Sequence, residues 1–326
     1  MKILITGSVG FIGFHLSKTL LEQGEEGVGV DCFTNYYDPQ MKEERNKILT
    51  SYDAYSFHKI SIADYEVFHK IVREEKPDAI VHLAAQAGVR YSLTNPWAYA
   101  EANYLGTLNV FECAKAENIS KVLYASSSSV YGDNKKLPFS ESDRTDHPVS
   151  LYAASKKANE VLAYAYHSLY GINSVGLRFF TVYGTYGRPD LALFKFTKSI
   201  LKGDTIDVYN NGDMKRSFTY IDDIISGILT LLSKEVKGTD IYNLGGADSI
   251  SLNDFVSLIE DNLDIKAKIN YLPMQLGDVK EAVADITKAQ KELDFEPKTS
   301  IKDGVPIFID WFLKEKDWLM SLEDGK

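Results

Sequence analysis

The chain has 326 residues, of which 44% are hydrophobic and 25% are charged, as is ordinary for a globular protein. Its formal net charge of -10 argues against a nucleic-acid-binding protein, which needs a basic surface. No apolar run approaches the roughly 20 residues that span a bilayer. The two cysteines, Cys32 and Cys113, predict neither a disulfide framework nor a metal site. We therefore expect a cytoplasmic protein with no nucleic-acid or membrane partner.

Short apolar strands alternate with helical segments through the first half of the chain. The expected strands are 2–6, 27–31, 79–84, 121–127 and 174–180, and the expected helices are 11–24 and segments near 65–75, 97–117 and 150–170. Nearly continuous apolar strands that alternate with helices are typical of a parallel sheet with both faces covered. The predicted fold class is α/β, with a doubly wound parallel sheet of the Rossmann type.

The second half of the chain is less regular. Helices are expected at 191–203 and 251–263, and a buried strand at 240–246 predicts that the chain returns to the main sheet. This pattern indicates a smaller C-terminal α/β domain for substrate and a cleft between two domains. The expected division is a Rossmann domain of 1–180 plus about 214–247, and a substrate domain of about 181–213 plus 248–326.

Three glycines follow the first strand in the string GSVGFIG. Gly7 permits a tight turn, Gly10 lets the backbone approach a pyrophosphate, and Gly13 allows the helix to pack closely on the strand. The N-terminus of that helix offers N–H groups to phosphate. Asp31 ends the second strand, where its carboxylate can accept both ribose hydroxyls and repel a 2′-phosphate. The motif therefore predicts a dinucleotide site that prefers NAD.

A Tyr-x-x-x-Lys pair, Tyr152 and Lys156, lies in the helix that follows the fifth strand. Residues four apart share one face of a helix. We expect the lysine and the positive nicotinamide ring to lower the pKa of the phenol, so that Tyr152 acts as general acid and base. The preceding strand ends in ASSSSVYG, and Ser127 is expected to bind the reacting hydroxyl beside Tyr152.

These motifs resemble the extended short-chain dehydrogenase/reductase family along almost the whole chain. Six longer strings resemble the UDP-glucuronate 4-epimerases within it: HLAAQAGVRYS (82–92), YASSSSVYG (124–132), HPVSLYAASKKANE (147–160), LRFFTVYGTYGRPDLALF (177–194), RSFTYIDD (216–223) and LPMQLGD (272–278). The resemblance implies further cofactor contacts at Phe11, Ile12, Ile62, Leu83, Ala84, Ala85, Gln86 and Asn103. Ser61 departs from the acidic residue that relatives carry beside the adenine.

The resemblance also implies how the chain handles its substrate. Dehydratases of the family carry an Asp-Glu pair at the positions of Ser128 and Ser129, and UDP-glucuronate decarboxylases carry a Glu at Ser129. Both serines are instead expected to contact the sugar. The reaction left is oxidation at C4, rotation of the 4-keto sugar and re-reduction with bound NAD, which would interconvert UDP-glucuronate and UDP-galacturonate.

The remaining substrate contacts follow from the same resemblance. Thr181 and Arg188 are expected to hold the sugar carboxylate, and Arg188 can do so with two parallel hydrogen bonds. Further residues are assigned to the UDP group: Arg216 and Lys195 to the diphosphate, Gln275 and Asp278 to the ribose. Arg90 can serve either a phosphate or the carboxylate. Arg178, inside an apolar strand, and His82 are expected to be structural.

Relatives use the helices at 97–117 and 150–170 to form a homodimer, which we expect here too. Three alternatives stay open. They are a 4-epimerase for a neutral sugar such as UDP-glucose, a UDP-glucuronate decarboxylase, and a catalytically silent NAD-binding regulatory or scaffold protein. The last is disfavoured because Tyr152 and Lys156 are both present.

Overall fold

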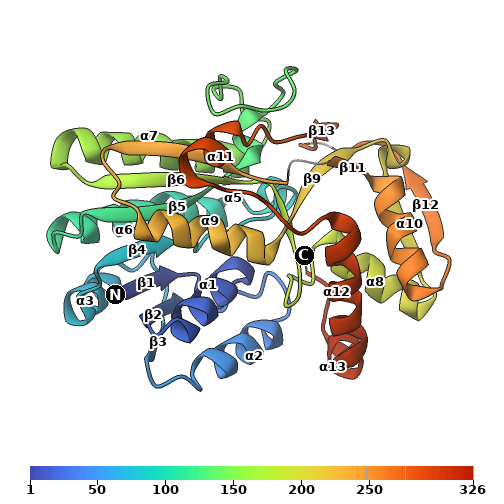
Figure 1. Ribbon diagram of the computed structural model, residues 1–326, viewed down its shortest axis with the longest axis horizontal. Coiled ribbons are helices and arrows are strands. Elements are labelled where there is room, and N and C mark those ends of the chain that lie inside the picture. Colours follow the sequence, from blue (N-terminus) through green and yellow to red (C-terminus); the bar gives the residue numbers. More distant parts are fainter. Residues whose placement is uncertain (247–248, 276, 326) are drawn as a thin grey trace.

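A seven-stranded parallel sheet forms the centre of the computed structural model, which describes residues 1–246, 249–275 and 277–325 (Figure 1). The strand order is β10-β6-β5-β4-β1-β2-β3. The strands are β1 (Lys2–Thr6), β2 (Glu26–Asp31), β3 (Tyr55–Lys59), β4 (Ala79–His82), β5 (Lys121–Ser127), β6 (Asn173–Phe179) and β10 (Thr239–Leu244). The order reverses between β1 and β4, so the carboxyl ends there flank a ligand crevice. The expected α/β fold is confirmed.

Apolar side chains project from both faces of this sheet, and helices cover both faces (Figure 1). In β1, Ile3 and Ile5 join one buried cluster and Leu4 joins the other. The first cluster is covered by α1 (Phe11–Glu22), α2 (Gln40–Leu49), α9 (Ile221–Ser233) and α11 (Thr287–Leu293). The second is covered by α3 (Tyr65–Glu75), α6 (Gly106–Ala116) and α7 (Leu151–Tyr170). Sequence analysis did not predict β3 or α2, which complete the β2 edge.

A smaller part lies beyond the carboxyl ends of the strands, on the right in Figure 1. Its helices are α8 (Ala192–Lys202), α10 (Leu252–Leu263), α12 (Ile301–Lys314) and α13 (Lys316–Ser321). One small sheet contains β7 (Thr181–Tyr183), β9 (Lys215–Tyr220), β11 (Ser249–Ser251) and β13 (Glu281–Ala282), and a second pairs β8 (Thr205–Tyr209) with β12 (Lys268–Leu272). We propose the two-domain division that the sequence indicates, with one change. β9 belongs to the smaller part, because it pairs with β7, β11 and β13.

The helix expected at 97–117 is interrupted. The chain instead forms α4 (Tyr91–Thr94), α5 (Pro96–Tyr99), a π-helical turn η1 (Ala100–Leu105) and then α6. Two short 3₁₀ helices lie elsewhere in the chain, η2 (Ser128–Tyr131) and η3 (Asn210–Gly212). The Asn103 carbonyl inside the π turn accepts hydrogen bonds from Asn159 Nδ2 at 2.7 Å and Thr107 Oγ1 at 2.6 Å. Among the helices of the described ranges, none is long and apolar enough to cross a membrane.

Candidate active site

The glycine turn between β1 and α1 has the shape that a pyrophosphate needs. Gly7 adopts a φ of +71°, and a Cβ there would lie 2.7 Å from the backbone nitrogen of Ala84. A Cβ on Gly13 would lie 2.1 Å from the Gly7 carbonyl oxygen, so the helix can pack this closely only without one. Gly10 caps α1 without a side-chain hydrogen bond. The first N–H groups of α1 can therefore bind phosphate.

Asp31 lies at the end of β2, buried against a lysine that the sequence analysis missed. Asp31 Oδ1 accepts hydrogen bonds from Lys42 Nζ at 2.8 Å and from the backbone N–H of Phe33 at 2.9 Å. Both bonds use one oxygen, which leaves Oδ2 to accept from a ribose. Lys42 comes from α2, whose polar sequence gave no signal for a site. Asp31 thus neutralises the positive charge of Lys42 beside the ribose position.

This pairing predicts how the cofactor preference can be changed. We expect Asp31→Asn to weaken NAD binding about tenfold, because a hydrogen bond to a charged acceptor contributes roughly 1.5–3 kcal/mol. The same variant should bind NADP more tightly than the parent, since Lys42 becomes available to a 2′-phosphate. Titration of nucleotide-free protein with both dinucleotides measures the two affinities. Unchanged affinities for both would contradict the role of Asp31.

Two of the expected cofactor residues are buried and make protein contacts. Asn103 is 1% exposed, and its Oδ1 accepts from Gln86 N at 2.8 Å while its Nδ2 donates to Gln86 O at 3.0 Å. Asn103 therefore fixes the segment after β4. Ile62 is 6% exposed and packs against Gly106. In Leu83–Gln86, the Ala84 N–H donates to Thr6 Oγ1 at 3.2 Å.

The tyrosine and lysine of the Tyr-x-x-x-Lys pair lie at the buried start of α7. This helix begins after Ser150, whose side chain accepts from the Ala153 N–H at 3.1 Å. Tyr152 is 9% exposed, and its ring lies edge-on to Tyr99 with centroids 6.2 Å apart. Lys156 is 2% exposed, and its Nζ donates to the backbone carbonyl of Ala125 at 2.8 Å.

The protonation of this pair differs from the sequence-based prediction. Burial raises the pKa of the Tyr152 phenol above its ordinary value, while its hydrogen bond with Ser127 and the charge of Arg188 act in the opposite direction. Burial also lowers the pKa of Lys156 to about 7. A lysine that is partly neutral near pH 7 does little to stabilise a phenolate. The protein alone therefore does not depress the pKa of Tyr152, and the expected lowering depends on the positive nicotinamide ring.

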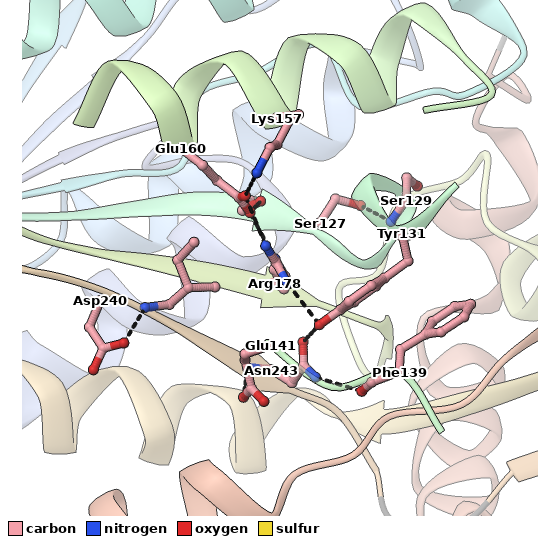
Figure 2. Close-up of polar contacts among 12 residues, drawn as sticks. Ser127, Ser129, Tyr131, Phe139, Glu141, Lys157, Glu160, Arg178, Asp240 and Asn243 are labelled. Atoms are coloured by element: carbon pink, nitrogen blue, oxygen red, sulfur yellow. Dashed lines mark hydrogen bonds and ion pairs between the residues drawn. The ribbon is translucent and has the colours of Figure 1, made fainter. Parts of the chain in front are cut away.

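The serine turn that ends β5 carries Ser127 and Ser129 (Figure 2), and Ser127 lies close to Tyr152. Ser127 Oγ accepts from the Ser129 N–H at 3.2 Å, and Ser127 lies close enough to Tyr152 to lower the pKa of its phenol. Ser128 and Ser129 are half-buried. Ser126 points to the other side of the strand, where its hydroxyl donates to Glu160 Oε1 at 2.7 Å.

A cleft of about 620 Å³ lies among β7, α8, β8 and β9 and is within the usual range of ligand pockets. Six of the residues expected to bind substrate line it: Arg90, Thr181, Arg188, Lys195, Arg216 and Asp278. Ser128, Ser129 and Gln275 are not part of this lining, and neither are Ser127 and Tyr152. Arg188, which lines the cleft, is close enough to Tyr152 for its charge to lower the pKa of the phenol.

Arg188 is held in the cleft by an acid that the sequence analysis did not single out. Its Nε donates to Asp190 Oδ1 at 2.9 Å and its Nη2 to Asp190 Oδ2 at 2.5 Å, and the guanidinium lies 5.8 Å from the ring centre of Tyr36. Asp190 thus occupies the Nε/Nη2 edge of the Arg188 guanidinium. The N–H groups of the other edge, on Nη1 and Nη2, remain for a sugar carboxylate. The Arg-x-Asp spacing was the available signal for this pair.

Arg216 is also largely engaged with the protein. It donates to the backbone carbonyls of Lys215 at 2.8 Å, Lys280 at 3.0 Å and Val279 at 2.6 Å, and burial lowers its pKa. A guanidinium has five N–H donors, so two remain for a diphosphate. These bonds also fix the segment that follows Asp278.

Of the two residues expected at the ribose, Asp278 lines the cleft and Gln275 lies outside its lining. Arg90 Nη2 is 3.3 Å from Asp278 Oδ2, and its guanidinium stacks 4.6 Å from the ring centre of Tyr209. Gln275 Oε1 is buried and makes no hydrogen bond within the described residues. That oxygen can therefore accept a hydrogen bond from a ligand hydroxyl.

Two residues that we expected to be structural are confirmed as such. His82 Nδ1 lies 2.7 Å from Thr6 Oγ1 and its Nε2 lies 2.9 Å from Thr107 Oγ1, and burial lowers its pKa to about 3. Arg178 forms a buried ion pair with Glu160 through two hydrogen bonds of 2.8 and 2.9 Å.

The similarity of this chain to known proteins agrees with the site. The family model described as "NAD dependent epimerase/dehydratase family" matches residues 3–245. The chain is 53% identical over 323 residues to an uncharacterised protein of Methanocaldococcus jannaschii, covering 98% of this chain and 99% of that protein. It is 42% identical over 330 residues to a probable UDP-glucuronate 4-epimerase of Rhizobium meliloti, covering 96% of this chain and 97% of that protein.

Among solved structures, the chain is similar to the UDP-glucuronic acid 4-epimerase of Bacillus cereus in complex with UDP-glucuronic acid and NAD. The TM-score is 0.91 at 33% sequence identity, and the match covers 96% of this chain and 99% of that one. The glycine turn, the buried Asp31 and the Tyr152–Lys156 pair fit the same cofactor. The chain belongs to the NAD-dependent epimerase/dehydratase family, within the extended short-chain dehydrogenases/reductases, and is an NAD-dependent enzyme of that family.

Proposed function

We propose that this enzyme is a UDP-glucuronate 4-epimerase, which interconverts UDP-glucuronate and UDP-galacturonate. The observation that carries the proposal is the lining of the cleft beside Tyr152, which combines Thr181 and Arg188 with three more cationic side chains. A nucleotide sugar acid brings two kinds of anion, a diphosphate and a carboxylate, and the cleft provides cationic groups for both. Two of the similar proteins named above support this: the Rhizobium meliloti protein is described as a probable UDP-glucuronate 4-epimerase, and the Bacillus cereus 4-epimerase is bound to UDP-glucuronic acid.

The proposed reaction begins and ends at Tyr152. Bound NAD supplies the hydride acceptor and returns the hydride, so it is not consumed. The Tyr152 phenolate takes the proton of the C4 hydroxyl, which Ser127 holds by a hydrogen bond, and the C4 carbon becomes a carbonyl. The 4-keto sugar then turns in the cleft and presents its other face. Tyr152 gives the proton back to the C4 oxygen, and the configuration at C4 is inverted.

The carboxylate of a 4-keto uronic acid must be restrained, because a β-keto acid loses carbon dioxide when its carboxylate aligns with the carbonyl. We propose that Thr181 and the three remaining N–H groups of Arg188 hold the carboxylate out of that alignment. The Asp190 pair keeps the Arg188 side chain in one orientation. Ser128 and Ser129 are assigned to neighbouring sugar hydroxyls. Acidic residues at these two positions would instead promote dehydration or decarboxylation.

The UDP group is assigned to the other end of the cleft. Arg216 and Lys195 would bind the diphosphate, and Gln275 and Asp278 the ribose. Arg90 contacts Asp278, which supports a place for Arg90 at the nucleotide and not at the sugar carboxylate.

Incubation of the purified enzyme with UDP-glucuronate, followed by NMR, tests the proposal. We expect the NMR signals of UDP-galacturonate, whose C4 hydroxyl is axial, to grow without added NAD, because the cofactor is regenerated in each cycle. UDP-pentose as the main product would assign the enzyme to the decarboxylases. Activity on UDP-glucose alone would show that the substrate carries no carboxylate. No turnover of either substrate would leave a protein that binds NAD without catalysis.

We further propose that the enzyme works as a homodimer in the cytoplasm. Large apolar side chains are exposed along the outer faces of α6 and α7, and they are Leu108, Leu151, Val161, Tyr164 and Leu169. A second copy of these helices would bury them. Both cysteines are free thiols, as is usual in a reducing compartment.

A further inference from the structure

A buried polar network lies next to the serine turn, on the face of β5 that packs against α7 (Figure 2). Its centre is the Glu160–Arg178 ion pair, whose side chains are 2% and 3% exposed. Arg178 Nη1 also donates to the Tyr131 hydroxyl at 3.0 Å. That hydroxyl donates in turn to Asn243 Oδ1 at 2.6 Å. The network thus joins α7, β6, η2 and β10.

The network binds the residues on both sides of the serine turn. Before the turn, the Ser126 hydroxyl donates to Glu160 Oε1 at 2.7 Å. After it, Tyr131 ends η2 and is held by Arg178 through its hydroxyl and through its ring, which lies 4.8 Å from the guanidinium carbon. Ser127 lies between these two anchors. Glu160 is one helical turn after Lys156 on α7, so the same carboxylate also ties the turn to the helix that carries Tyr152.

The far end of the network reaches the C-terminal part of the chain. Asn243 Nδ2 donates to the carbonyls of Phe139 at 2.8 Å and Asp285 at 3.0 Å, and the Asn243 N–H donates to Glu141 Oε1 at 2.8 Å. The Tyr131 ring stacks on Phe139 with centroids 4.6 Å apart. The anchor behind the turn is therefore itself fixed from several directions.

A buried ion pair of this kind is a weak source of stability, because removing two charges from water offsets much of their attraction. Its hydrogen bonds nevertheless define one geometry, since every partner of the carboxylate and the guanidinium has a fixed direction. The reaction needs such a fixed geometry, because Ser127 and Tyr152 must both meet the C4 oxygen before and after the sugar turns.

We propose that the Glu160–Arg178 pair positions Ser127 against Tyr152, acting through the hydroxyls of Ser126 and Tyr131. These four residues are positioning residues that do not touch the reacting atoms. The inference goes beyond the choice of sugar substrate, because it concerns only the proton transfer that Tyr152 performs.

Two single-hydroxyl deletions test this role while they keep the ion pair intact. Ser126→Ala removes the anchor before the turn, and Tyr131→Phe removes the anchor after it but keeps the ring against Phe139 and Arg178. Substitution of Glu160 is avoided because it would leave the Arg178 guanidinium buried without its partner. Asp223→Asn is the matched control. Asp223 is a buried carboxylate that accepts from the N–H groups of Lys298 and Thr299 at 2.9 and 3.0 Å, away from the turn.

Each variant is assayed over a range of pH with the sugar nucleotide on which the parent is most active. We expect kcat to fall about tenfold in both hydroxyl variants while KM changes less than about twofold, because misplacement of a reacting group affects the chemical step more than binding. The lower limb of the pH profile of kcat should move to higher pH. The hydrogen bond with Ser127 favours the phenolate, so its loss raises the pKa of Tyr152.

The groups that face Tyr152 are unchanged in these variants: Tyr99 from α5, Lys156 from α7 and Arg188 from the cleft. A shift of the limb is therefore due to Ser127. Thermal unfolding and bound NAD verify that each protein is folded. The proposal is overturned if kcat and the pH limb of both hydroxyl variants match the parent, or if Asp223→Asn shifts the limb as far as they do.

Discussion

Tyr152→Phe is expected to lower kcat by about a thousandfold while NAD remains bound. A general acid and base contributes roughly 10²–10⁴-fold to a reaction, and a phenyl ring can neither take nor return the proton at C4. Tyr152 is buried and packs edge-on against Tyr99, so the ring without its hydroxyl should keep the same place. The free energy of unfolding should therefore stay close to that of the parent.

Initial rates of epimerisation, with the amount of bound NAD measured in the same preparation, check this expectation. Tyr170→Phe is the control, because Tyr170 lies on the same helix, is 51% exposed and is not assigned to the dimer interface. The control should retain the parent rate. A Tyr152→Phe enzyme with more than a tenth of the parent kcat would show that another group moves the proton.

The second large effect is expected at Arg188 and Asp190, which should be changed together. Removal of Arg188 alone would leave Asp190 as a buried, unpaired carboxylate and would cost roughly 3–5 kcal/mol of stability. The double variant Arg188→Gln/Asp190→Asn replaces the ion pair by a neutral pair of similar size. We expect its kcat/KM for UDP-glucuronate to fall about a hundredfold, because a charge-assisted contact to the carboxylate is lost. UDP-pentose should form a larger share of the product.

Parallel measurements with UDP-glucose separate a loss of carboxylate binding from general damage. Activity on this neutral substrate should change little in the double variant. Arg144→Gln/Asp146→Asn is a matched control, because this pair has the same Arg-x-Asp spacing but is exposed, with Arg144 Nε 2.8 Å from Asp146 Oδ2. Equal losses for both substrates, or no loss for UDP-glucuronate, would refute the assignment of Arg188 to the carboxylate.

Local patterns in the sequence determined the fold class and the main parts of the cofactor and catalytic site. The strands β1 and β5 were predicted at the residues where they occur, since a doubly covered strand must be apolar along its length. The glycine turn was predictable because each of Gly7, Gly10 and Gly13 meets a steric demand of its own chain neighbourhood. Tyr152 and Lys156 followed from their helical spacing.

Only the tertiary structure decided which partners these residues have. Lys42 meets Asp31 through packing of α2 at the sheet edge, and Asn103 is turned inward by its bonds to Gln86. The pKa of Tyr152 likewise depends on burial, which no spacing reveals. Charge, hydrogen bonding and solvent exclusion act between segments that are far apart in the chain. The sequence by itself therefore determined which groups are present, and the packing decided which of them remain available to a ligand.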